Sequence, residues 1–385
     1  MKKILYVSRP IAPPWDEASK NFAYNLSKEV VLTNSDLEIH LMTNGKLGKL
    51  PNNIVQENIY TSSEKDFKFS QKIRLFWFLL RNAKKFDIIH LLFTPTKFNS
   101  FLLKFILLKL SLQPSPEGRE GTKIIQTVAT LREDLFSDKE IKKMMFGDVI
   151  TTYSEYAKNK LKKLELSNIR KVYPGIDLKD YCPKEKSDKF LNKYGFSKND
   201  FIINFTGEYV RLGAMDDIIN SFIEISKRIP ETKLSLAVRV KNKKDAKKKE
   251  EIIAKLKEND LIDKVAFHDD GNYKMSDIFN VCDISLFPVR NMQGKFDIPL
   301  AVIEAMACGK PVIISDIPIL KEFSNKNNSI QVRAGNTEDI TSAILSLYNN
   351  KEKSKNLGES ARRYVQENFS IEKTAEKYSK IYKSL

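Results

Sequence analysis

The sequence is poor in cysteine and histidine. Among 385 residues the cysteines are Cys182, Cys282 and Cys308, and the histidines are His40, His90 and His268. Three scattered cysteines argue against a disulfide framework and favour a reducing compartment. The histidines are dispersed, and no spacing of cysteine and histidine suits zinc. We therefore expect a cytoplasmic protein without a metal ion.

Long apolar runs are also missing. The N-terminus, MKKILYV, is basic and then apolar, but Arg9 and Pro10 end the run too early for a signal peptide. This segment is predicted to be a first strand. Two later segments, 71–85 and 98–112, are strongly apolar, but they are too short and too interrupted by lysine and arginine to span a bilayer.

Acidic residues are outnumbered, with 49 Asp+Glu against 65 Lys+Arg and a net charge of +16. Residues 1–172 carry 29 basic and 18 acidic residues, a net of +11, and the remainder carries 36 and 31, a net of +5. An uneven basic excess indicates an anionic partner, either a membrane surface or nucleic acid. No aromatic RNA-binding pattern or recognition-helix motif is present, so we expect no nucleic acid partner.

What the sequence does have is a regular alternation of short β-runs and helix-length amphipathic stretches. This pattern predicts parallel sheets covered by helices on both faces. The expected strands are 3–8, 37–43, 87–93, 123–130 and 148–154, then 201–206, 233–240, 264–268, 283–288 and 311–315. The expected helices are 19–31, 71–85, 98–112 and 155–164, then 215–228, 244–259, 275–281, 300–308, 337–348, 354–368 and 371–385.

The two series predict two doubly wound, Rossmann-like α/β domains. We expect an N-terminal domain at 1–174, an interdomain segment at 175–199, and a C-terminal domain at 200–368. The last helix, 369–385, is expected to pack back on the N-terminal domain. Ligands of such folds bind outside the carboxyl ends of the strands, so two facing sheets predict a substrate cleft between the domains.

One stretch, GKFDIPLAVIEAMACGKPVIISD at 294–316, combines a loop, a short apolar helix and a buried strand. Pro299 suits a first helical turn, and Gly309 falls where a glycine ends a helix. Glu304 lies about one turn into this helix among residues that otherwise belong to a core. Its carboxylate must reach a polar rim or find a partner.

Three segments carry a further signal, EAMACGKPVI (304–313), KVYPGIDL (171–178) and TTYSEYAKNKL (151–161). Together they resemble the retaining glycosyltransferases of the GT-B fold, in the large fourth family that uses nucleotide-sugar donors. The resemblance implies that Glu304 holds the ribose hydroxyls of the donor nucleotide, because a carboxylate can accept two hydrogen bonds from a diol. An acidic residue that only stabilises the first turns of its helix is the alternative.

The chain departs from this family where the donor sugar is expected. The family's second glutamate, eight residues before the first, corresponds to Phe296, and Pro299 stands where a glycine is usual. Asp297 can reach the same space, which makes it a candidate catalytic residue, or it can cap the helix that follows.

The diphosphate clamp departs as well. The family places an arginine and a lysine after a strand that ends in glycine, here Gly207, but Glu208 and Leu212 occupy those positions. Because a leaving diphosphate needs cations, we expect Arg211 and Lys295 to be catalytic, with Arg290 as a further ligand. An ordinary surface arginine is the alternative for Arg211. Gly207, Glu208 and the backbone amides of Leu300 and Ala301 complete the expected donor site.

In the first domain, Asp16 and Glu17 replace the family's paired glycines and would repel a phosphate. Lys20 offers a cation nearby, and His90 matches a histidine that is often seen at a strand end. Both are candidate substrate ligands. For His90 the alternative is a structural residue whose ring nitrogens are satisfied.

The apolar segments 71–85 and 98–112 carry lysine and arginine among Phe, Trp and Leu residues. They are either core helices or basic amphipathic helices that lie in a lipid headgroup region. We therefore expect an anionic membrane surface as a candidate partner, at the inner face of the cell membrane.

The resemblance thus implies a retaining hexosyltransferase with no cofactor besides its nucleoside diphosphate sugar, which is a substrate. The expected acceptor is a glycan or lipid-linked molecule of cell-envelope polysaccharide or glycoconjugate synthesis. A non-catalytic protein of the same fold that binds nucleotide or glycan as an assembly partner is the alternative, because Asp16-Glu17, Glu208, Leu212 and Phe296 replace expected features.

Overall fold

The computed structural model describes residues 1–13, 17–61, 69–111, 121–269 and 273–385. The chain folds into two compact units. The first consists of Met1–Ile176 together with Ser370–Leu385, and the second of Asp177–Phe369. Most of the segment expected to link two domains, 175–199, therefore lies in the second unit, where it contributes helix α6 (Asp188–Lys193).

The first unit, within the described residues, holds a seven-stranded parallel sheet in the order β3-β2-β1-β4-β5-β6-β7. The strands are β1 (Lys2–Ile11), β2 (Leu37–Thr43), β3 (Ile54–Asn58), β4 (Ile88–Leu91), β5 (Lys123–Val128), β6 (Val149–Thr152) and β7 (Ile169–Lys171). The helices are α1 (Ala18–Thr33), α2 (Phe69–Asn82), η1 (Ala83–Lys85), α3 (Lys97–Ser111), α4 (Asp138–Met144), α5 (Glu155–Lys163) and α13 (Ile371–Lys383).

The second unit holds a six-stranded parallel sheet in the order β10-β9-β8-β11-β12-β13 within the residues described. The strands are β8 (Phe201–Gly207), β9 (Thr232–Val238), β10 (Val265–Phe267), β11 (Ile284–Phe287), β12 (Val312–Ser315) and β13 (Ile330–Val332). Its helices are α6, α7 (Met215–Arg228), α8 (Lys243–Glu258), η2 (Ile262–Lys264), α9 (Met275–Val281), α10 (Leu300–Ala307), η3 (Pro318–Glu322), α11 (Thr337–Asn349) and α12 (Lys351–Asn368).

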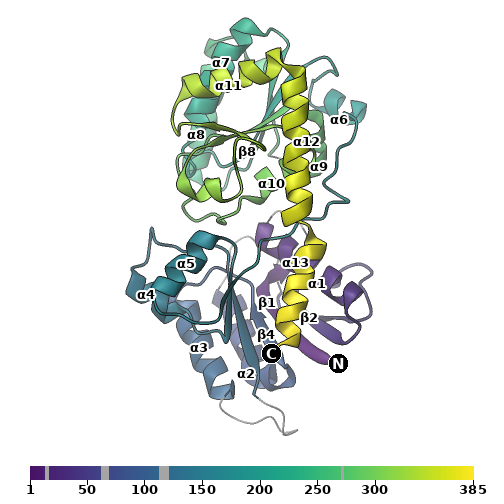
Figure 1. The fold of residues 1–385 in the computed structure, drawn as a ribbon, viewed down its shortest axis with the longest axis vertical. Coiled ribbons are helices and arrows are strands. Elements are labelled where there is room, and N and C mark those ends of the chain that lie inside the picture. The colour runs from purple at the N-terminus through teal and green to yellow at the C-terminus, as the bar shows by residue number, and fades with distance from the viewer. Residues whose placement is uncertain (14–16, 62–68, 112–120, 270–272) are drawn as a thin grey trace. The chain divides into compact units, whose positions relative to one another are not determined.

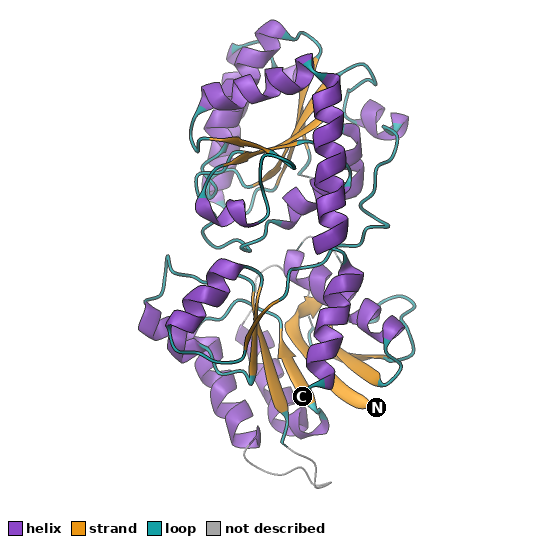
Figure 2. Ribbon diagram, in the orientation of Figure 1, coloured by secondary structure: helices purple, strands orange, loops and turns teal. Residues whose placement is uncertain are grey.

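In each unit helices lie on both faces of the sheet, as Figure 2 shows. The central strands β4, β11 and β12 are buried along their whole length. Their apolar side chains have no solvated face, which is why these segments are continuous in Ile, Leu and Val rather than alternating. The prediction of two doubly wound α/β domains is confirmed.

The C-terminal helix α13 belongs to the first unit and lies beside α1 (Figure 1). Asn34 donates a hydrogen bond to the Ser379 hydroxyl at 3.0 Å, and Gly175 lies against the start of α13. A Cβ on Gly175 would stand 2.6 Å from the Ile371 Cα, closer than side chains allow. The backbone contact therefore requires a glycine at position 175.

The strands that the sequence did not predict, β3, β7 and β13, all lie at sheet edges. Edge strands are partly solvated, so their burial is mixed and their apolar pattern is weak. The two unpredicted α-helices of the described residues, α4 and α6, are short segments that begin at the cap residues Ser137 and Ser187. Among the described helices none is long and apolar enough to cross a membrane.

Candidate active site

The second sheet changes direction between β8 and β11, because the chain builds outward from β8 through β9 to β10 and then returns to β11 on the other side. Two loops leave the carboxyl ends of these adjacent strands, one from β8 to α7 and one from β11 to α10. Such a switch point is where doubly wound sheets bind ligands. Most of the residues that the sequence singled out in this unit lie on these two loops or on α10.

A buried carboxylate, Glu208, is the centre of a charged cluster in these loops. Its Oε1 lies 2.6 Å from the Nζ of Lys295 and 2.5 Å from the Nζ of Lys241, and its Oε2 lies 3.0 Å from the Nε of Arg211. The four side chains follow three neighbouring strands, β9, β8 and β11. In the described part of the chain, three cations thus surround one carboxylate, which leaves a local charge of +2.

Electrostatics keep this cluster charged. Burial opposes ionisation of Glu208, but the ammonium groups of Lys295 and Lys241 outweigh it and hold the pKa of the carboxylate at about 2. Burial lowers the pKa of Lys295, and Glu208 opposes that shift. Glu208 therefore acts as a fixed anion that gathers cations which would otherwise repel one another.

Backbone and side-chain bonds join the two loops. The Arg290 amide donates to the Leu212 carbonyl at 2.9 Å, and the Asn291 amide group donates to the Arg211 carbonyl at 3.2 Å. Arg211 in turn donates to the Gly294 carbonyl at 3.4 Å. Arg211 and Lys295 are therefore carried by loops that hold each other in place.

Arg290, the further cation expected from the sequence, has a different partner. Its guanidinium forms a bidentate pair with the buried Asp217 of α7, at 3.0 and 2.8 Å, and its side chain packs against Gly213 and Gly335. This pair raises the pKa of Arg290 and neutralises its charge locally. Arg290 supports the loop rather than joining the cluster around Glu208.

Helix α10 presents the second part of the site. Val302 and Ile303 donate to the Pro299 carbonyl, so the amides of Leu300 and Ala301 come before the first intrahelical bonds. Gly309, at φ +71°, ends the helix as expected. Backbone amides that precede the first intrahelical bonds and the positive end of the helix dipole make this end attractive to anions.

Glu304 is half-buried one turn into α10 and is hydrogen-bonded to the phenol of Tyr181. Burial raises the pKa of the Glu304 carboxyl to about 7, while the Tyr181 hydrogen bond acts in the opposite direction. With a pKa of about 7 and one hydrogen bond, from Tyr181, the carboxylate still has lone pairs that can accept hydrogen bonds from a ligand.

Asp297 is buried, with 6% of its surface exposed, and Pro299, not Asp297, occupies the N-cap of α10.

Gly207, which ends β8, lies against the ring of Phe205. A Cβ at this position would stand 2.4 Å from the Phe205 Cζ, so a side chain here requires the ring to move.

Two candidate ligands from the first unit are buried among its own groups. His90 is completely buried in β4, with its Nδ1 2.8 Å from the Tyr382 hydroxyl and its Nε2 2.6 Å from the Thr127 hydroxyl. Burial lowers its pKa to about 3. This is the structural role that the sequence left open, and the predicted role of His90 as a substrate ligand is corrected accordingly.

Lys20 lies in α1, is 4% exposed and donates to the Ala12 carbonyl at 3.2 Å. Its ammonium is therefore directed at the protein's own backbone. Asp16 lies outside the described residues. Its neighbour Glu17 pairs with Arg9 at 2.8 Å.

The sequence did not identify Lys241 or Tyr181 as site residues. Lys241 begins a lysine-rich run that suggests a solvated helix start, and its place beside Glu208 depends on the order of β9 and β8. The sequence contains one indication that Lys241 belongs to the site: it directly follows the predicted strand 233–240. Tyr181 lies in the segment expected to be a linker, which gave no reason to place it against α10.

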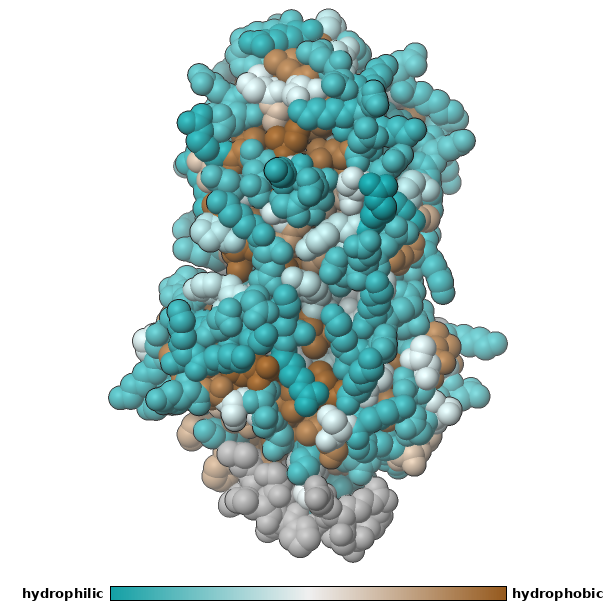
Figure 3. Space-filling model, in the orientation of Figure 1, coloured by the Kyte–Doolittle hydropathy of each residue, from teal (hydrophilic) through white to brown (hydrophobic). Residues whose placement is uncertain are grey.

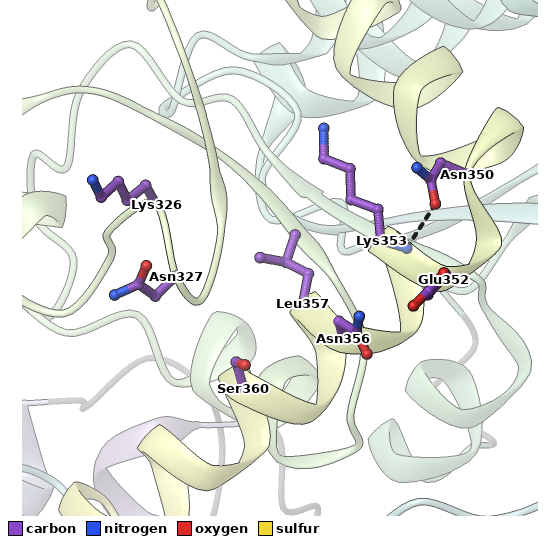
Figure 4. Close-up of a pocket in the computed structure, with 8 residues that line it drawn as sticks. All are labelled: Lys326, Asn327, Asn350, Glu352, Lys353, Asn356, Leu357 and Ser360. Carbon is purple, nitrogen blue, oxygen red and sulfur yellow. Dashed lines mark hydrogen bonds between the residues drawn. The ribbon is translucent and has the colours of Figure 1, made fainter.

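A pocket of about 440 Å³ lies elsewhere in the second unit, where α12 meets the loop before β13 (Figure 4). It is lined by Lys326, Asn327, Asn350, Glu352, Lys353, Asn356, Leu357 and Ser360. The side chain of Asn350 accepts from the Lys353 amide at 2.8 Å and so caps α12. None of the predicted site residues lines this pocket.

Among the residues described, no group of three His, Cys, Asp or Glu side chains is placed to hold a metal ion.

The comparisons with known proteins agree with this geometry. The family described as glycosyl transferases group 1 matches residues 186–364, nearly the whole second unit. An uncharacterised glycosyltransferase of Methanocaldococcus jannaschii is 24% identical over 80% of this chain and 79% of its own length. The N-acetyl-alpha-D-glucosaminyl L-malate synthase of Bacillus anthracis is 24% identical over 90% of this chain and 88% of its own.

Among solved structures, Anabaena HepE in complex with UDP-glucose superposes with a TM-score of 0.75 over the whole of both chains, at 14% sequence identity. This likeness establishes a shared fold. The second unit thus matches the group 1 glycosyltransferase family, the chain is similar to glycosyltransferases along most of its length, and it has the GT-B fold.

Proposed function

We propose that this protein transfers a hexose, with retention of configuration, from a nucleoside diphosphate sugar to a glycan or lipid-linked acceptor in cell-envelope polysaccharide or glycoconjugate synthesis. The observation that carries the proposal is the cation cluster around Glu208, at the switch point of the second sheet and on the loop that leads into α10. A diphosphate is the group whose charge matches a local excess of +2.

In this proposal the donor lies along the β8 and β11 loops and α10. Glu304 accepts hydrogen bonds from the ribose hydroxyls, and Tyr181 holds the carboxylate in place. Lys241, Lys295 and Arg211 face the diphosphate together with the amides of Leu300 and Ala301. The solved relative HepE was crystallised with UDP-glucose, which supports a donor of this class.

Catalysis then rests on positioning and on the leaving group. As the bond from sugar to phosphate breaks, negative charge grows on the diphosphate, and fixed cations stabilise it more in the transition state than in the ground state. We propose that these protein cations fill this role without a metal ion. The acceptor attacks from the face that the diphosphate leaves, without a protein nucleophile, and Asp297 faces the sugar.

The surroundings of Glu208 also help to choose between an enzyme and a non-catalytic protein of the same fold. An acidic residue in place of the family's arginine first suggested a site that had lost its diphosphate clamp. Neighbouring strands bring Lys241 and Lys295 to that carboxylate, so the local charge is positive despite the substitution. The observation favours the enzyme.

A panel of nucleotides and nucleotide sugars tests the proposal by thermal shift. We expect one nucleoside diphosphate and its sugar conjugates to raise the unfolding temperature, because a ligand that binds only the folded state stabilises it. The corresponding nucleoside should have a much weaker effect, since it lacks the diphosphate. No shift with any member of the panel would contradict the proposed donor site.

A further inference from the structure

Helices α2 and α3 of the first unit expose an unusual number of large apolar side chains. Of the thirteen such side chains that are exposed among the described residues, seven lie on these two helices. They are Phe69, Ile73, Trp77 and Leu80 on α2, and Phe98, Phe101 and Phe105 on α3. We call these seven residues the aromatic face. Exposed apolar side chains are usually scattered, so their concentration on neighbouring helices indicates an interaction surface.

The aromatic face is separate from the hydrophobic core. Leu75 and Leu79 of α2 and Leu103 and Leu107 of α3 are buried in the first unit's core. Each helix thus has one apolar side in the core and a second in solvent. This arrangement explains why both segments contain more apolar residues than a helix with a single buried side needs.

The exposed apolar residues of α2 and those of α3 form one surface. Along α2 the exposed residues recur at positions 69, 73, 77 and 80, which is the spacing of a single helix side. The Nζ of Lys72 lies 6.0 Å from the ring centroid of Phe98, so the helices adjoin at this side. Figure 3 shows apolar atoms at the surface in the area where Figure 1 places α3.

Positive charge accompanies the aromatic face. Residues 69–111 contain eight basic residues, Lys72, Arg74, Arg81, Lys84, Lys85, Lys97, Lys104 and Lys109, and one acidic residue, Asp87. The Arg81 guanidinium lies 5.3 Å from the ring centroid of Trp77, which places a cation directly beside an exposed aromatic ring. The surface therefore offers apolar groups and cations together.

From this combination we infer that the aromatic face docks the protein on an anionic lipid bilayer. Phe and Trp side chains enter the boundary between headgroups and acyl chains, while Lys and Arg remain at the lipid phosphates. A second copy of this chain fits less well, because a symmetric contact would bring two equally basic surfaces together. The inference is independent of the donor site.

Trp77 provides a direct test in the intact protein. The chain has two tryptophans, Trp15 and Trp77, so the Trp15→Phe variant leaves Trp77 as a single fluorescent reporter. With vesicles of phosphatidylcholine and phosphatidylglycerol we expect its emission to move to shorter wavelength and to become shielded from acrylamide. Vesicles of phosphatidylcholine alone, or high salt, should give much smaller changes.

Cosedimentation with the same vesicles tests which residues bind. Trp77→Ser combined with Phe101→Ser should lower the partition coefficient at least about tenfold. Arg74→Gln combined with Lys104→Gln should lower it roughly 25-fold, at about fivefold for each cation removed. The matched control is Leu32→Ser, which removes an equally exposed apolar residue from α1 and should bind as the wild type does.

Three outcomes would overturn the inference. They are failure of the wild type to bind anionic vesicles, an equal loss in the Leu32→Ser control, and a concentration-dependent dimer that Phe101→Ser abolishes. Circular dichroism of each variant establishes that it is folded. No nucleotide is present in these assays, so a negative result leaves the proposed transferase function untouched, and a failed nucleotide panel leaves this inference untouched.

Discussion

At the scale of single residues, the proposed donor site depends on a carboxylate that stands where the resembled family usually has an arginine. Glu208 is 3% exposed, and the cations around it come from three different strands. A single substitution relative to the family pattern has thus been accommodated by residues that lie far apart in the sequence. In the proposed donor site, the cations that face the diphosphate therefore come from positions that differ from the family pattern.

Lys241 offers the sharpest test of that arrangement. We predict that Lys241→Met lowers kcat/KM for the nucleotide sugar about tenfold or more, because one cation at the leaving group is lost. Affinity for the nucleoside alone should not change, since it has no diphosphate. Lys243→Met, two residues further at the start of α8, is the matched control and should behave as wild type. Equal effects of both variants would remove Lys241 from the site.

Glu304 predicts a pH dependence of donor binding. Its pKa of about 7 means that the carboxyl is largely protonated in the free protein at pH 6, and a proton must leave before the carboxylate accepts two hydroxyl donors. Affinity for a nucleotide sugar, whose diphosphate diester does not titrate here, should therefore fall by up to about tenfold per pH unit below 7. Isothermal titration calorimetry should show this dependence in wild type and lose it in Glu304→Gln.

The raised pKa of Glu304 affects folding stability in the opposite direction to donor binding. Because the pKa of Glu304 is higher in the folded than in the unfolded protein, its contribution to stability is complete below about pH 4.5 and is lost as pH rises towards 7. Donor binding and folding thus respond to this group in opposite directions. A binding profile that improved as pH fell below 7 would contradict the assigned role.

At the scale of elements, the alternation of strands and helices was readable because buried parallel strands are continuously apolar. The edge strands β3, β7 and β13 were not predicted; β7, for example, has three residues and one of them is exposed. Glu304, Lys295 and Arg211 could be proposed from local sequence. Lys241 could not, because its contact with Glu208 exists only once β9 lies beside β8.

Helix α13 is held in the first unit by a buried polar network. The hydroxyl of Tyr382 lies 2.8 Å from that of Tyr6 and 2.8 Å from the His90 Nδ1, and the hydroxyl of Tyr378 lies 3.0 Å from that of Thr127. Such a network is costly if any member lacks a partner. His90 is thus a residue that fastens the C-terminal helix to the sheet.

This network predicts an acid-sensitive first unit. The pKa of His90 is about 3 in the folded protein against 6.5 for an ordinary histidine, so the unfolded state binds a proton first as pH falls. Stability should be unaffected by this group above pH 6.5 and should decrease below it by up to about 1.4 kcal/mol per pH unit. Urea unfolding of His90→Gln should show a shallower decrease than wild type. Parallel slopes would argue against the buried neutral ring.

At the scale of the whole molecule, charge and function are divided between the units. Residues 1–172 carry a net charge of +11, and the aromatic face lies within them. The residues of the proposed donor site lie in the second unit. We interpret this division as one unit that meets an anionic surface carrying the acceptor and another that holds the nucleotide sugar.

The central claim is that the protein transfers a sugar with retention from a nucleoside diphosphate donor. The most direct test incubates the protein with the nucleotide sugar selected by thermal shift and an acceptor, and follows the anomeric proton of the product by NMR. We predict a new glycosidic bond with the same anomeric configuration as the donor, and no product with Glu304→Ala. An inverted product, or no turnover of any nucleotide sugar, would contradict the account.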